Sequence, residues 1–297
     1  MRALVTGATG FIGKHLLGRL EKPVVLTRNP DHLGRPVGEV YSWDPMSGPP
    51  PDAALHDVDV VFHLAGEPVA TGRWTAAKRR RIRESRSVGT ANLVRGLQSV
   101  AGPPRVLVSS SAIGYYGNRG DELLDENAQS GSDFLAEVCR EWEAAASVAR
   151  QYGIHVVNPR TGIVLGRGGG SLDKMLLPFK LGMGAQLGNG RQWMSWIHVD
   201  DMVGLLLHAA THDTVTGPMN AVAPHPVTNR EFTQSLAQAV QRPAFMRMPG
   251  LILKLLAGEF AEVLLASQRV VPQVALDTGY TFRYADLPAA LEAIVRG

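Results

Sequence analysis

The sequence contains a single cysteine, Cys139, among its 297 residues. One thiol excludes an internal disulfide and a cysteine-based zinc site, and it fits a reducing compartment. No apolar run reaches the length of a membrane-spanning helix, and the chain begins on a short apolar strand instead of a charged leader followed by an apolar segment. These absences predict a cytoplasmic protein without a metal site and without a membrane partner.

Neither sign of charge is in large excess: the sequence has 30 Lys and Arg residues and 27 Asp and Glu residues, for a net charge of +3. The clearest basic cluster runs from Lys78 to Arg86. It contains no aromatic residue and is interleaved with Ile82, Glu84 and Ser85. We therefore expect a solvated helix face, with some residues turned toward cofactor phosphates, and no nucleic-acid partner.

The first thirteen residues carry the most informative pattern. The apolar residues 3–5 lead into Gly7, Gly10 and Gly13, and the chain then passes directly into a helical stretch. Gly7 suits a tight turn, Gly10 lets a pyrophosphate approach the backbone, and Gly13 allows close packing of helix on strand. This order predicts a dinucleotide site at the helix N-terminus. The residues predicted to bind the cofactor here are Gly7, Thr9, Gly10, Phe11, Ile12 and Gly13.

A second apolar run, residues 24–26, follows one helix length later and completes a strand–helix–strand unit. Glycine turns also occur without ligands, but this context favours dinucleotide binding. Arg28 stands just beyond the second strand, where an acid would bind the ribose 2′-hydroxyl and repel a 2′-phosphate. A guanidinium attracts that phosphate, so Arg28 favours NADP over NAD unless it is only a solvated loop residue.

The strand of residues 58–64 ends in His63, Leu64, Ala65 and Gly66. Small residues at the carboxyl end of a parallel strand let the adenine side of a cofactor lie close to the backbone. These four residues are therefore candidate cofactor contacts. His63 fits a packed core equally well.

The strand of residues 105–109 ends in a run of hydroxyls, Ser109 to Ser111, followed by Tyr115 and Tyr116. A hydroxyl at the end of a central parallel strand, where a nicotinamide lies, can hydrogen-bond a substrate carbonyl or alcohol. A serine run is also compatible with a simple strand cap. We retain Ser111, Tyr115 and Tyr116 as candidate catalytic residues and Ser109 as a candidate cofactor contact.

Strand and helix patterns alternate along the chain, which predicts an α/β fold. Helices are expected at residues 75–97, 133–150, 199–210, 229–240, 251–257, 261–265 and 287–295. Glycine-rich loops at 166–170 and 182–190 flank a short helix and suit a substrate lid. Asp200 and Asp201 are interpreted as structural, because acids at a helix N-terminus favour the dipole and cap free amides.

Several phrases of the sequence together resemble one known superfamily. They are the glycine turn, His63-Leu-Ala-Gly66, the serines leading into Tyr-Gly, Asn158-Pro-Arg160 and Trp196-Ile-His-Val-Asp-Asp201. This combination resembles the extended short-chain dehydrogenase/reductase superfamily. Residues 191–198 and 139–143 are similar to its nucleoside-diphosphate-sugar epimerase subgroup, which carries a C-terminal domain of unknown function, here from Pro243 onward.

The resemblance implies a Rossmann-type doubly wound parallel sheet, a bound NADP and a smaller C-terminal substrate domain. Residues 1–165 would form most of the NADP-binding domain, with 191–222 returning to it, and 166–190 and 223–297 would form the smaller domain. In this superfamily the turn at Pro159 and Arg160 passes near the nicotinamide, and Arg86 stands where a catalytic-network Asn is common. The cofactor-binding residues predicted outside the glycine turn are Arg28, His63, Leu64, Ala65, Gly66, Arg86, Ser109, Pro159 and Arg160.

One departure from the superfamily bears on catalysis. Its acid and base are a Tyr-x-x-x-Lys pair on one face of the helix after the serine strand, and residues 133–150 contain neither residue type. If Glu143 matches the acid that commonly follows the pair, Leu135 and Cys139 occupy the two positions. Tyr115 and Tyr116 are the nearest substitutes, or they only pack and hydrogen-bond in their loop. Cys139 is expected to be buried and inert.

The expected substrate is a small molecule, either a nucleotide sugar or another carbonyl or alcohol. Arginine suits a diphosphate or carboxylate and tryptophan a sugar face, although Trp196 suits the core equally well. The residues predicted to bind substrate are Glu67, Arg191, Trp193 and Trp196. The sequence thus predicts an NADP-binding oxidoreductase or epimerase, with a catalytically silent NADP-binding sensor or regulator as the alternative. A homodimer is left open.

Overall fold

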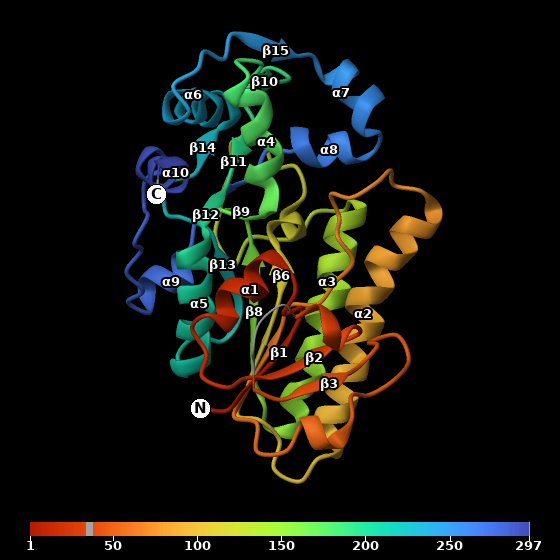
Figure 1. The fold of residues 1–297 in the computed structure, drawn as a ribbon. Coiled ribbons are helices and arrows are strands. Elements are labelled where there is room, and N and C mark those ends of the chain that lie inside the picture. The colour runs from red at the N-terminus through yellow and green to blue at the C-terminus, as the bar shows by residue number, and fades with distance from the viewer. Residues whose placement is uncertain (34–37, 297) are drawn as a thin grey trace.

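The computed structural model describes residues 1–33 and 38–296, and an eight-stranded parallel sheet lies at its centre (Figure 1). The strand order is β13-β8-β5-β4-β1-β2-β3, and the short strand β6 pairs with β8. The bounds are β1 Ala3–Thr6, β2 Val24–Thr27, β3 Val40–Ser42, β4 Val60–His63, β5 Val106–Ser109, β6 Ser111–Ala112, β8 His155–Thr161 and β13 Gly217–Ala221. The predicted fold class, an α/β protein with a doubly wound parallel sheet, is confirmed.

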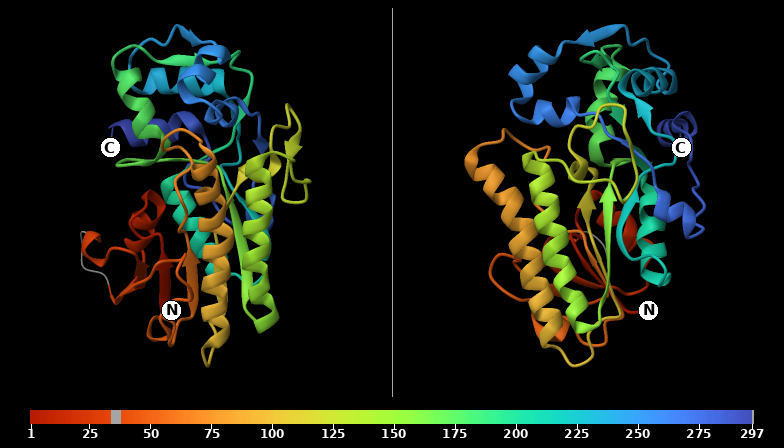
Figure 2. Two further views of the ribbon diagram at one scale, coloured as in Figure 1. Left: turned by 90° about the vertical axis from the view of Figure 1, so that its right-hand side faces the viewer. Right: turned by 180° about the vertical axis from the view of Figure 1, so that it is seen from behind.

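Helices cover both faces of this sheet (Figure 2). In β1, Ala3 and Val5 share a core cluster with α1 and α5, whereas Leu4 shares a second cluster with α2 and α3. Because both faces are covered, the central strands are continuous apolar runs. The four helices are α1 Phe11–Leu17, α2 Ala76–Ser99, α3 Phe134–Ser147 and α5 Val199–Thr211.

The predicted long helices are confirmed, and their starts have clear local causes. Thr75 begins α2 and Asp133 begins α3, each with a side chain that accepts from the backbone N–H three residues further on. Thr228 and Glu231 form a reciprocal capping box at the start of α6 (Asn229–Ala239). A 3₁₀ turn, Val148–Tyr152, extends α3 to the predicted end of that helix.

Helix α5 is capped differently from the prediction. Its N-cap is His198, whose Nδ1 accepts from the backbone N–H of Asp200 at 3.1 Å. Asp201 is buried, and its carboxylate accepts from the backbone N–H groups of Arg283 and Tyr284 at 2.8 and 2.9 Å. Asp201 is therefore structural, as predicted, but it ties the C-terminal segment to α5 instead of capping the helix.

The remaining elements lie largely beyond the carboxyl ends of the sheet strands, at the top of Figure 1. A separate core gathers Leu172, Phe232 and Leu291 from α4, α6 and α10. The helices are α4 Gly170–Lys180, α7 Gly250–Ala257, α8 Phe260–Leu265, α9 Gln273–Asp277 and α10 Leu287–Arg296. The short strands are β7 Leu123–Leu124, β9 Ile163–Leu165, β10 Ala185–Leu187, β11 Trp193–Met194, β12 Trp196–His198, β14 Val227–Thr228, β15 Met246–Met248 and β16 Arg269–Val270.

The sequence predicted α7, α8 and α10 but not α9, β15 or β16. These three elements span five residues or fewer, too few for a periodic pattern. The two strands pair with β10 and β7, which are far away in the sequence.

The glycine loop before α4 packs on the N-terminal turn. A Cβ at Gly169 would lie 2.7 Å from the Phe11 ring, and one at Gly166 would lie 2.8 Å from it. The loop predicted as a substrate lid thus contacts a residue of the predicted cofactor turn.

Candidate cofactor and catalytic site

Two glycines of the N-terminal turn, Gly7 and Gly13, are needed for the fold itself, whether or not a ligand is bound. Gly7 has a φ of +70°, and a Cβ there would lie 2.7 Å from the carbonyl carbon of Leu64. A Cβ at Gly13 would overlap the carbonyl oxygen of Gly7. These close approaches hold the start of α1 against the ends of β1 and β4.

Gly10 is not required in this way. Its φ of −72° is open to any residue, and it is exposed. Apart from chain neighbours, the only described atom within 4 Å of an added Cβ is the Gly7 carbonyl oxygen, at 3.2 Å. Gly10 therefore leaves room above the turn, which suits a pyrophosphate approaching the backbone. Thr9 beside it is exposed, and Ile12 is half-buried.

Arg28 lies at the same end of the sheet as this turn. Leu26 of β2 pairs with Thr6, the residue before Gly7, and Arg28 follows two residues later with an exposed side chain. This position agrees with the predicted contact to a 2′-phosphate.

The predicted contact between the His63 side chain and a cofactor is wrong. The ring is fully buried, with Nδ1 2.8 Å from Thr6 Oγ1 and Nε2 3.0 Å from Thr90 Oγ1. Burial lowers the pKa of His63 from 6.5 to about 4, so the ring stays neutral near pH 7. The alternative of a packed core histidine is right.

Arg86 lies beneath the loop that follows β4. Its Nη1 donates to the carbonyl oxygens of Glu67 and Ile82 at 3.1 and 3.0 Å, and its Cζ lies 4.9 Å from the centre of the Trp142 ring. A Cβ at Gly66 would lie 3.3 Å from that Cζ, so Gly66 leaves the guanidinium room.

Within the described part of the chain, no carboxylate forms an ion pair with Arg86. Burial lowers the pKa of its guanidinium. Arg86 is half-buried, and a cation taken partly out of water is costly unless an anion compensates it. Arg86 is therefore a strong candidate for a ligand contact beside the Leu64–Gly66 loop.

The serine run brings Ser111 to a carboxylate. Ser111 Oγ donates to Glu143 Oε1 at 2.7 Å, from β6 to α3. Ser109 is fully buried, and its hydroxyl has no partner among the described residues. The predicted contact of the Ser109 side chain with a cofactor is therefore wrong.

Arg160 fixes Glu143. Its Nε and Nη2 lie 2.9 and 3.0 Å from the two oxygens of Glu143, in a bidentate pair. Burial opposes the charge of Arg160, but the hydrogen-bonded Glu143 carboxylate outweighs it and raises the pKa of Arg160 well above its ordinary value. All three guanidinium nitrogens of Arg160 have partners within the protein, because Nε and Nη2 bond Glu143 and Nη1 donates to Tyr116 and Glu126. The Arg160 side chain is therefore structural. A backbone contact from Pro159 and Arg160 stays a prediction.

The strand register explains why these residues meet. Ser111 pairs with Arg160 between β6 and β8, and Arg160 pairs with Asn220 between β8 and β13. The three side chains thus lie in one row across neighbouring strands.

Tyr116 belongs to the same buried network. Its hydroxyl donates to Asn220 Oδ1 at 2.7 Å and accepts from Arg160 Nη1 at 3.0 Å. Burial raises the pKa of Tyr116 to about 12. Because the side chain is fully buried, the predicted catalytic role of Tyr116 is wrong. Tyr115 is half-buried, and its ring centre lies 3.4 Å from Arg160 Cζ, so it covers the guanidinium.

Leu135 and Cys139, which the sequence predicts at the positions of the missing pair, face the loop after β6. A Cβ at Gly114 would lie 3.3 Å from Leu135 Cβ and 3.9 Å from Cys139 Sγ. The predicted burial of Cys139 is confirmed. Burial, together with the charge of Glu143, raises the pKa of its thiol to about 11. A side chain that stays protonated near neutral pH does not replace the missing base.

The Glu67 carboxylate forms ion pairs with the basic cluster of α2. Its Oε1 lies 2.7 Å from Lys78 Nζ and 3.6 Å from Arg81 Nε, and the Lys78 ammonium holds the pKa of Glu67 below its usual range. Lys78 is buried. The prediction of a solvated basic face is therefore wrong for Lys78, which turns inward to Glu67.

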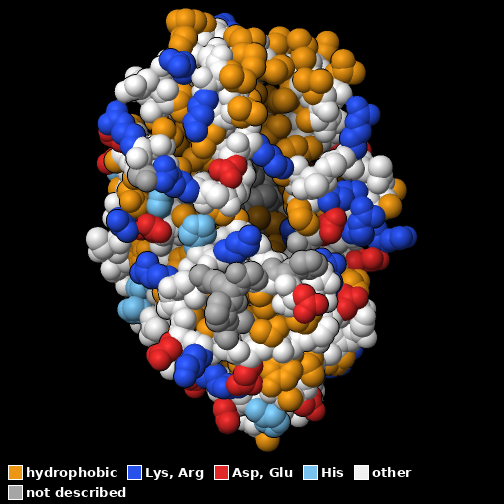
Figure 3. Space-filling view, in the orientation of Figure 1, with side chains coloured by type: hydrophobic (Ala, Val, Ile, Leu, Met, Phe, Trp, Pro, Cys, Tyr) orange, Lys and Arg blue, Asp and Glu red, His pale blue; other side chains and the backbone are white. Residues whose placement is uncertain are grey.

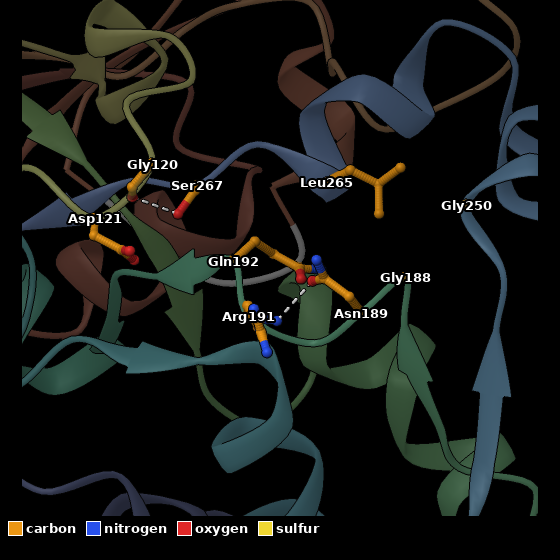
Figure 4. A pocket seen from close by; sticks show the side chains of 9 residues that line it. All are labelled: Gly120, Asp121, Gly188, Asn189, Arg191, Gln192, Gly250, Leu265 and Ser267. Atoms are coloured by element: carbon orange, nitrogen blue, oxygen red, sulfur yellow. Dashed lines mark hydrogen bonds between the residues drawn. The ribbon is translucent and has the colours of Figure 1, made fainter.

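Arg191 and Asp121 line a pocket of about 380 Å³ with Ser267 (Figure 4). Trp193 adjoins it, because its Nε1 donates to Asp121 Oδ1 at 2.8 Å. Arg269 lies over the Trp193 ring at 4.4 Å. Two predicted substrate residues, Arg191 and Trp193, thus meet at one pocket.

Trp196, by contrast, is fully buried in the core of the C-terminal part, and its Nε1 donates to the carbonyl of His225 at 3.1 Å. The prediction that Trp196 binds substrate is wrong. Across residues 1–33 and 38–296, no group of three or more His, Cys, Asp or Glu residues is placed to hold a metal ion. In that same part of the chain, no helix combines the length and apolarity needed to cross a bilayer.

The parallel sheet with its glycine turn defines a nucleotide-binding α/β protein of the Rossmann type. The chain belongs to the NAD dependent epimerase/dehydratase family, whose model matches residues 3–222. Residues 248–294 match a domain of unknown function. The predicted superfamily and C-terminal domain are confirmed, although the matched domain begins at residue 248 and not at Pro243.

The chain is similar to epimerase family proteins over its whole length. The chloroplastic SDR39U1 homolog of Arabidopsis thaliana is 38% identical and covers 100% of this chain and 87% of that protein. An epimerase family protein of Mycobacterium bovis is also 38% identical, with coverages of 97% and 95%. The crystal structure of human SDR39U1 with NADPH is 34% identical, with a TM-score of 0.89 and coverages of 100% and 99%. The predicted cofactor, NADP, agrees with the NADPH in that human crystal structure.

Proposed function

We propose that this chain binds NADP(H) and acts as an oxidoreductase or epimerase in which Ser111 exchanges a proton with the substrate. The observation that carries this proposal is the 2.7 Å hydrogen bond from Ser111 to Glu143 at the carboxyl end of the central strands. A bound nicotinamide would donate and accept hydride, and the protein would orient the substrate and move the proton.

The residues present fit a dinucleotide with a 2′-phosphate. Gly7 and Gly10 would hold the pyrophosphate, because the first makes the turn and the second leaves space above it. Arg28 would pair with the 2′-phosphate. Arg86, which lacks a carboxylate partner among the described residues, would contact the cofactor beside Gly66.

The proton has a defined route. Ser111 is 3% exposed, so a substrate alcohol would reach it only at its remaining accessible edge. Because the Ser111 hydroxyl donates to Glu143, its oxygen would accept from that alcohol. As the alcohol proton passes to Ser111 Oγ, the Ser111 proton passes to Glu143, and the same path returns it to a carbonyl oxygen. This geometry favours an alcohol as the group that first meets Ser111.

Arg160 sets the properties of this relay. The bidentate pair holds the Glu143 carboxylate in one orientation, with Oε1 also in reach of the Ser111 hydroxyl. Arg160 thus positions the carboxylate that receives the Ser111 proton in this proposal.

We further propose that residues 166–190 and 223–297 form the substrate part of the protein. The pocket beside Arg191 and Trp193 offers a guanidinium for a diphosphate and an aromatic face for a sugar ring. A nucleotide sugar is therefore the first substrate class to test, followed by simpler alcohols and carbonyl compounds.

The test is a substrate screen, with NADPH absorbance for net reduction and a product assay for epimerisation, which consumes no net NADPH. With a substrate identified, Ser111→Ala is expected to lower turnover at least about tenfold with NADPH affinity nearly unchanged. Full activity of this variant would remove Ser111 from the mechanism.

One observation favours the second candidate, a silent NADP-binding sensor or regulator. Helix α3 contains neither Tyr nor Lys, and neither Leu135 nor Cys139, the predicted replacements, can exchange a proton near pH 7. Tight NADPH binding with no turnover across the screen would favour this reading.

A further inference from the structure

The end of the molecule farthest from the central sheet is unusually apolar. Of the sixteen large hydrophobic side chains exposed in the described residues, nine lie within residues 177–183 and 245–256. Figure 3 shows hydrophobic atoms gathered at the top, over α4, β15 and α7. We call the exposed side chains of residues 174–185 and 241–258 the distal face.

The two segments form one surface because the backbone joins them. β10 and β15 pair in parallel, with Ala185 opposite Met246. Arg242 Nε also donates to the carbonyl oxygen of Lys180 at 3.3 Å. Residues about sixty positions apart in the chain therefore present their side chains together.

Helix α7 shows that this exposure follows a pattern. Leu253 is buried, whereas Leu251 and Leu255 are 81% and 75% exposed. Ile252 and Leu256 are exposed as well, so the outward positions repeat at i, i+1, i+4 and i+5 and form one stripe. A stripe of this kind is characteristic of a helix that meets an apolar partner.

The charges of the distal face are all positive. Residues 174–185 and 241–258 contain five Lys and Arg residues and no Asp or Glu. Lys174 turns toward the carbonyl of Ala70, and the other four, Lys180, Arg242, Arg247 and Lys254, are exposed. The nearest acids along the chain are Asp173, exposed in the first turn of α4 one residue before this face, and Glu259 and Glu262 at the start of α8. Glu259 lies 3.2 Å from Arg79, and Glu262 lies 3.7 Å from Lys254.

This charge pattern selects among partners. A second copy of the chain would bring two cationic surfaces together, which opposes association. An anionic partner is complementary. The most exposed side chains, Phe245 at 89% and Leu251 at 81%, project outward, and projecting side chains enter a bilayer interface without needing a matching pocket.

We infer that the distal face docks on the anionic headgroup surface of a lipid bilayer. The α7 leucines would enter the interface while Lys180, Arg247 and Lys254 reach the phosphates. An eight-residue helix is too short to span a membrane, so this is a peripheral contact. It does not depend on the proposed enzymatic function.

The test is sedimentation of the full chain with phosphatidylcholine vesicles that contain or lack phosphatidylserine. We expect binding at least about tenfold tighter to the anionic vesicles, and weaker binding at high salt. The Leu251→Ser/Leu255→Ser variant should lose at least about tenfold in affinity. Leu276→Ser, which changes an exposed leucine on α9, is the matched control and should bind like the parent.

Three results would overturn the inference. They are no binding to anionic vesicles, equal binding by the double variant, and light scattering that shows a dimer abolished by the same two substitutions. An unchanged melting temperature and NADPH affinity of the double variant would show that loss of vesicle binding is not a loss of fold.

Discussion

Ser111 and Glu143, 32 residues apart in the chain, are joined by a hydrogen bond of 2.7 Å between β6 and α3. Arg160 in turn clamps both oxygens of Glu143. A hydroxyl, a carboxylate and a guanidinium are thus in contact at the carboxyl end of the central strands. This contact is the basis of the proposed proton relay.

Cofactor choice is expected to depend on Arg28. The charged contact with a 2′-phosphate should favour NADP over NAD by ~1.5–3 kcal/mol, roughly tenfold or more. Titration calorimetry with both cofactors measures this, and Arg28→Ala should remove most of the difference. Arg230→Ala, an exposed arginine on α6, is the control. Equal affinities in the parent protein would exclude this role of Arg28.

The glycine turn gives a contrast between two substitutions. Gly10→Val should abolish NADPH binding with only a small change in the melting temperature of the free protein, because Gly10 has an ordinary φ and an added Cβ would meet only the Gly7 carbonyl oxygen, at 3.2 Å. Gly13→Ala should lower the melting temperature even without cofactor, because its Cβ would overlap the Gly7 carbonyl. Thermal shift with and without NADPH measures both. A Gly10→Val protein still stabilised by NADPH would count against the site.

Tyr116 is expected to matter for stability and not for chemistry. Tyr116→Phe leaves Arg160 Nη1 and Asn220 Oδ1 without their hydroxyl partner in a buried site, at a cost of ~1–3 kcal/mol in the free energy of unfolding. Urea denaturation measures this. Tyr152→Phe is the control, since that hydroxyl has no hydrogen bond among the described residues. A large loss of turnover in folded Tyr116→Phe would restore its catalytic role.

His63 should make stability depend on pH. Its pKa is about 4 in the folded protein and 6.5 ordinarily, so the unfolded chain binds the proton more readily. The stabilisation is present above pH 6.5 and is lost as the pH falls from 6.5 toward 4. Between pH 7 and pH 5 this group should lower the free energy of unfolding by about 2 kcal/mol. His63→Asn should remove that part of the dependence, and identical pH profiles would refute the assignment.

The N-terminal turn could be predicted because its signals are local. Gly7, Gly10 and Gly13 lie within seven residues. At each of them the lack of a side chain has a separate steric purpose, in the turn, at the pyrophosphate or in helix packing. The long helices were predictable for the same reason, since Thr75 and Asp133 cap them from the adjacent residue.

The catalytic network could not be predicted, because it depends on strand register. Ser111, Arg160 and Asn220 form a row only once β6, β8 and β13 pair, and Glu143 reaches that row from a helix. From the sequence, His63 and Trp196 could each either bind a ligand or pack in the core. Their complete burial in the structure shows that both pack in the core. The sequence did carry one signal for this network. Arg160 follows the apolar residues of a predicted strand, and an arginine that is buried there needs a carboxylate partner.

The most direct test of the account is single-turnover kinetics of the NADPH complex with an identified substrate, comparing the parent protein with Ser111→Ala and Glu143→Gln. The account predicts that each variant keeps the parent's NADPH affinity and loses at least about tenfold in the rate of the chemical step. It also predicts that the double variant loses little more than either single one, because the two residues act as one relay. Parent-like rates in both single variants, or losses that multiply in the double variant, would contradict it.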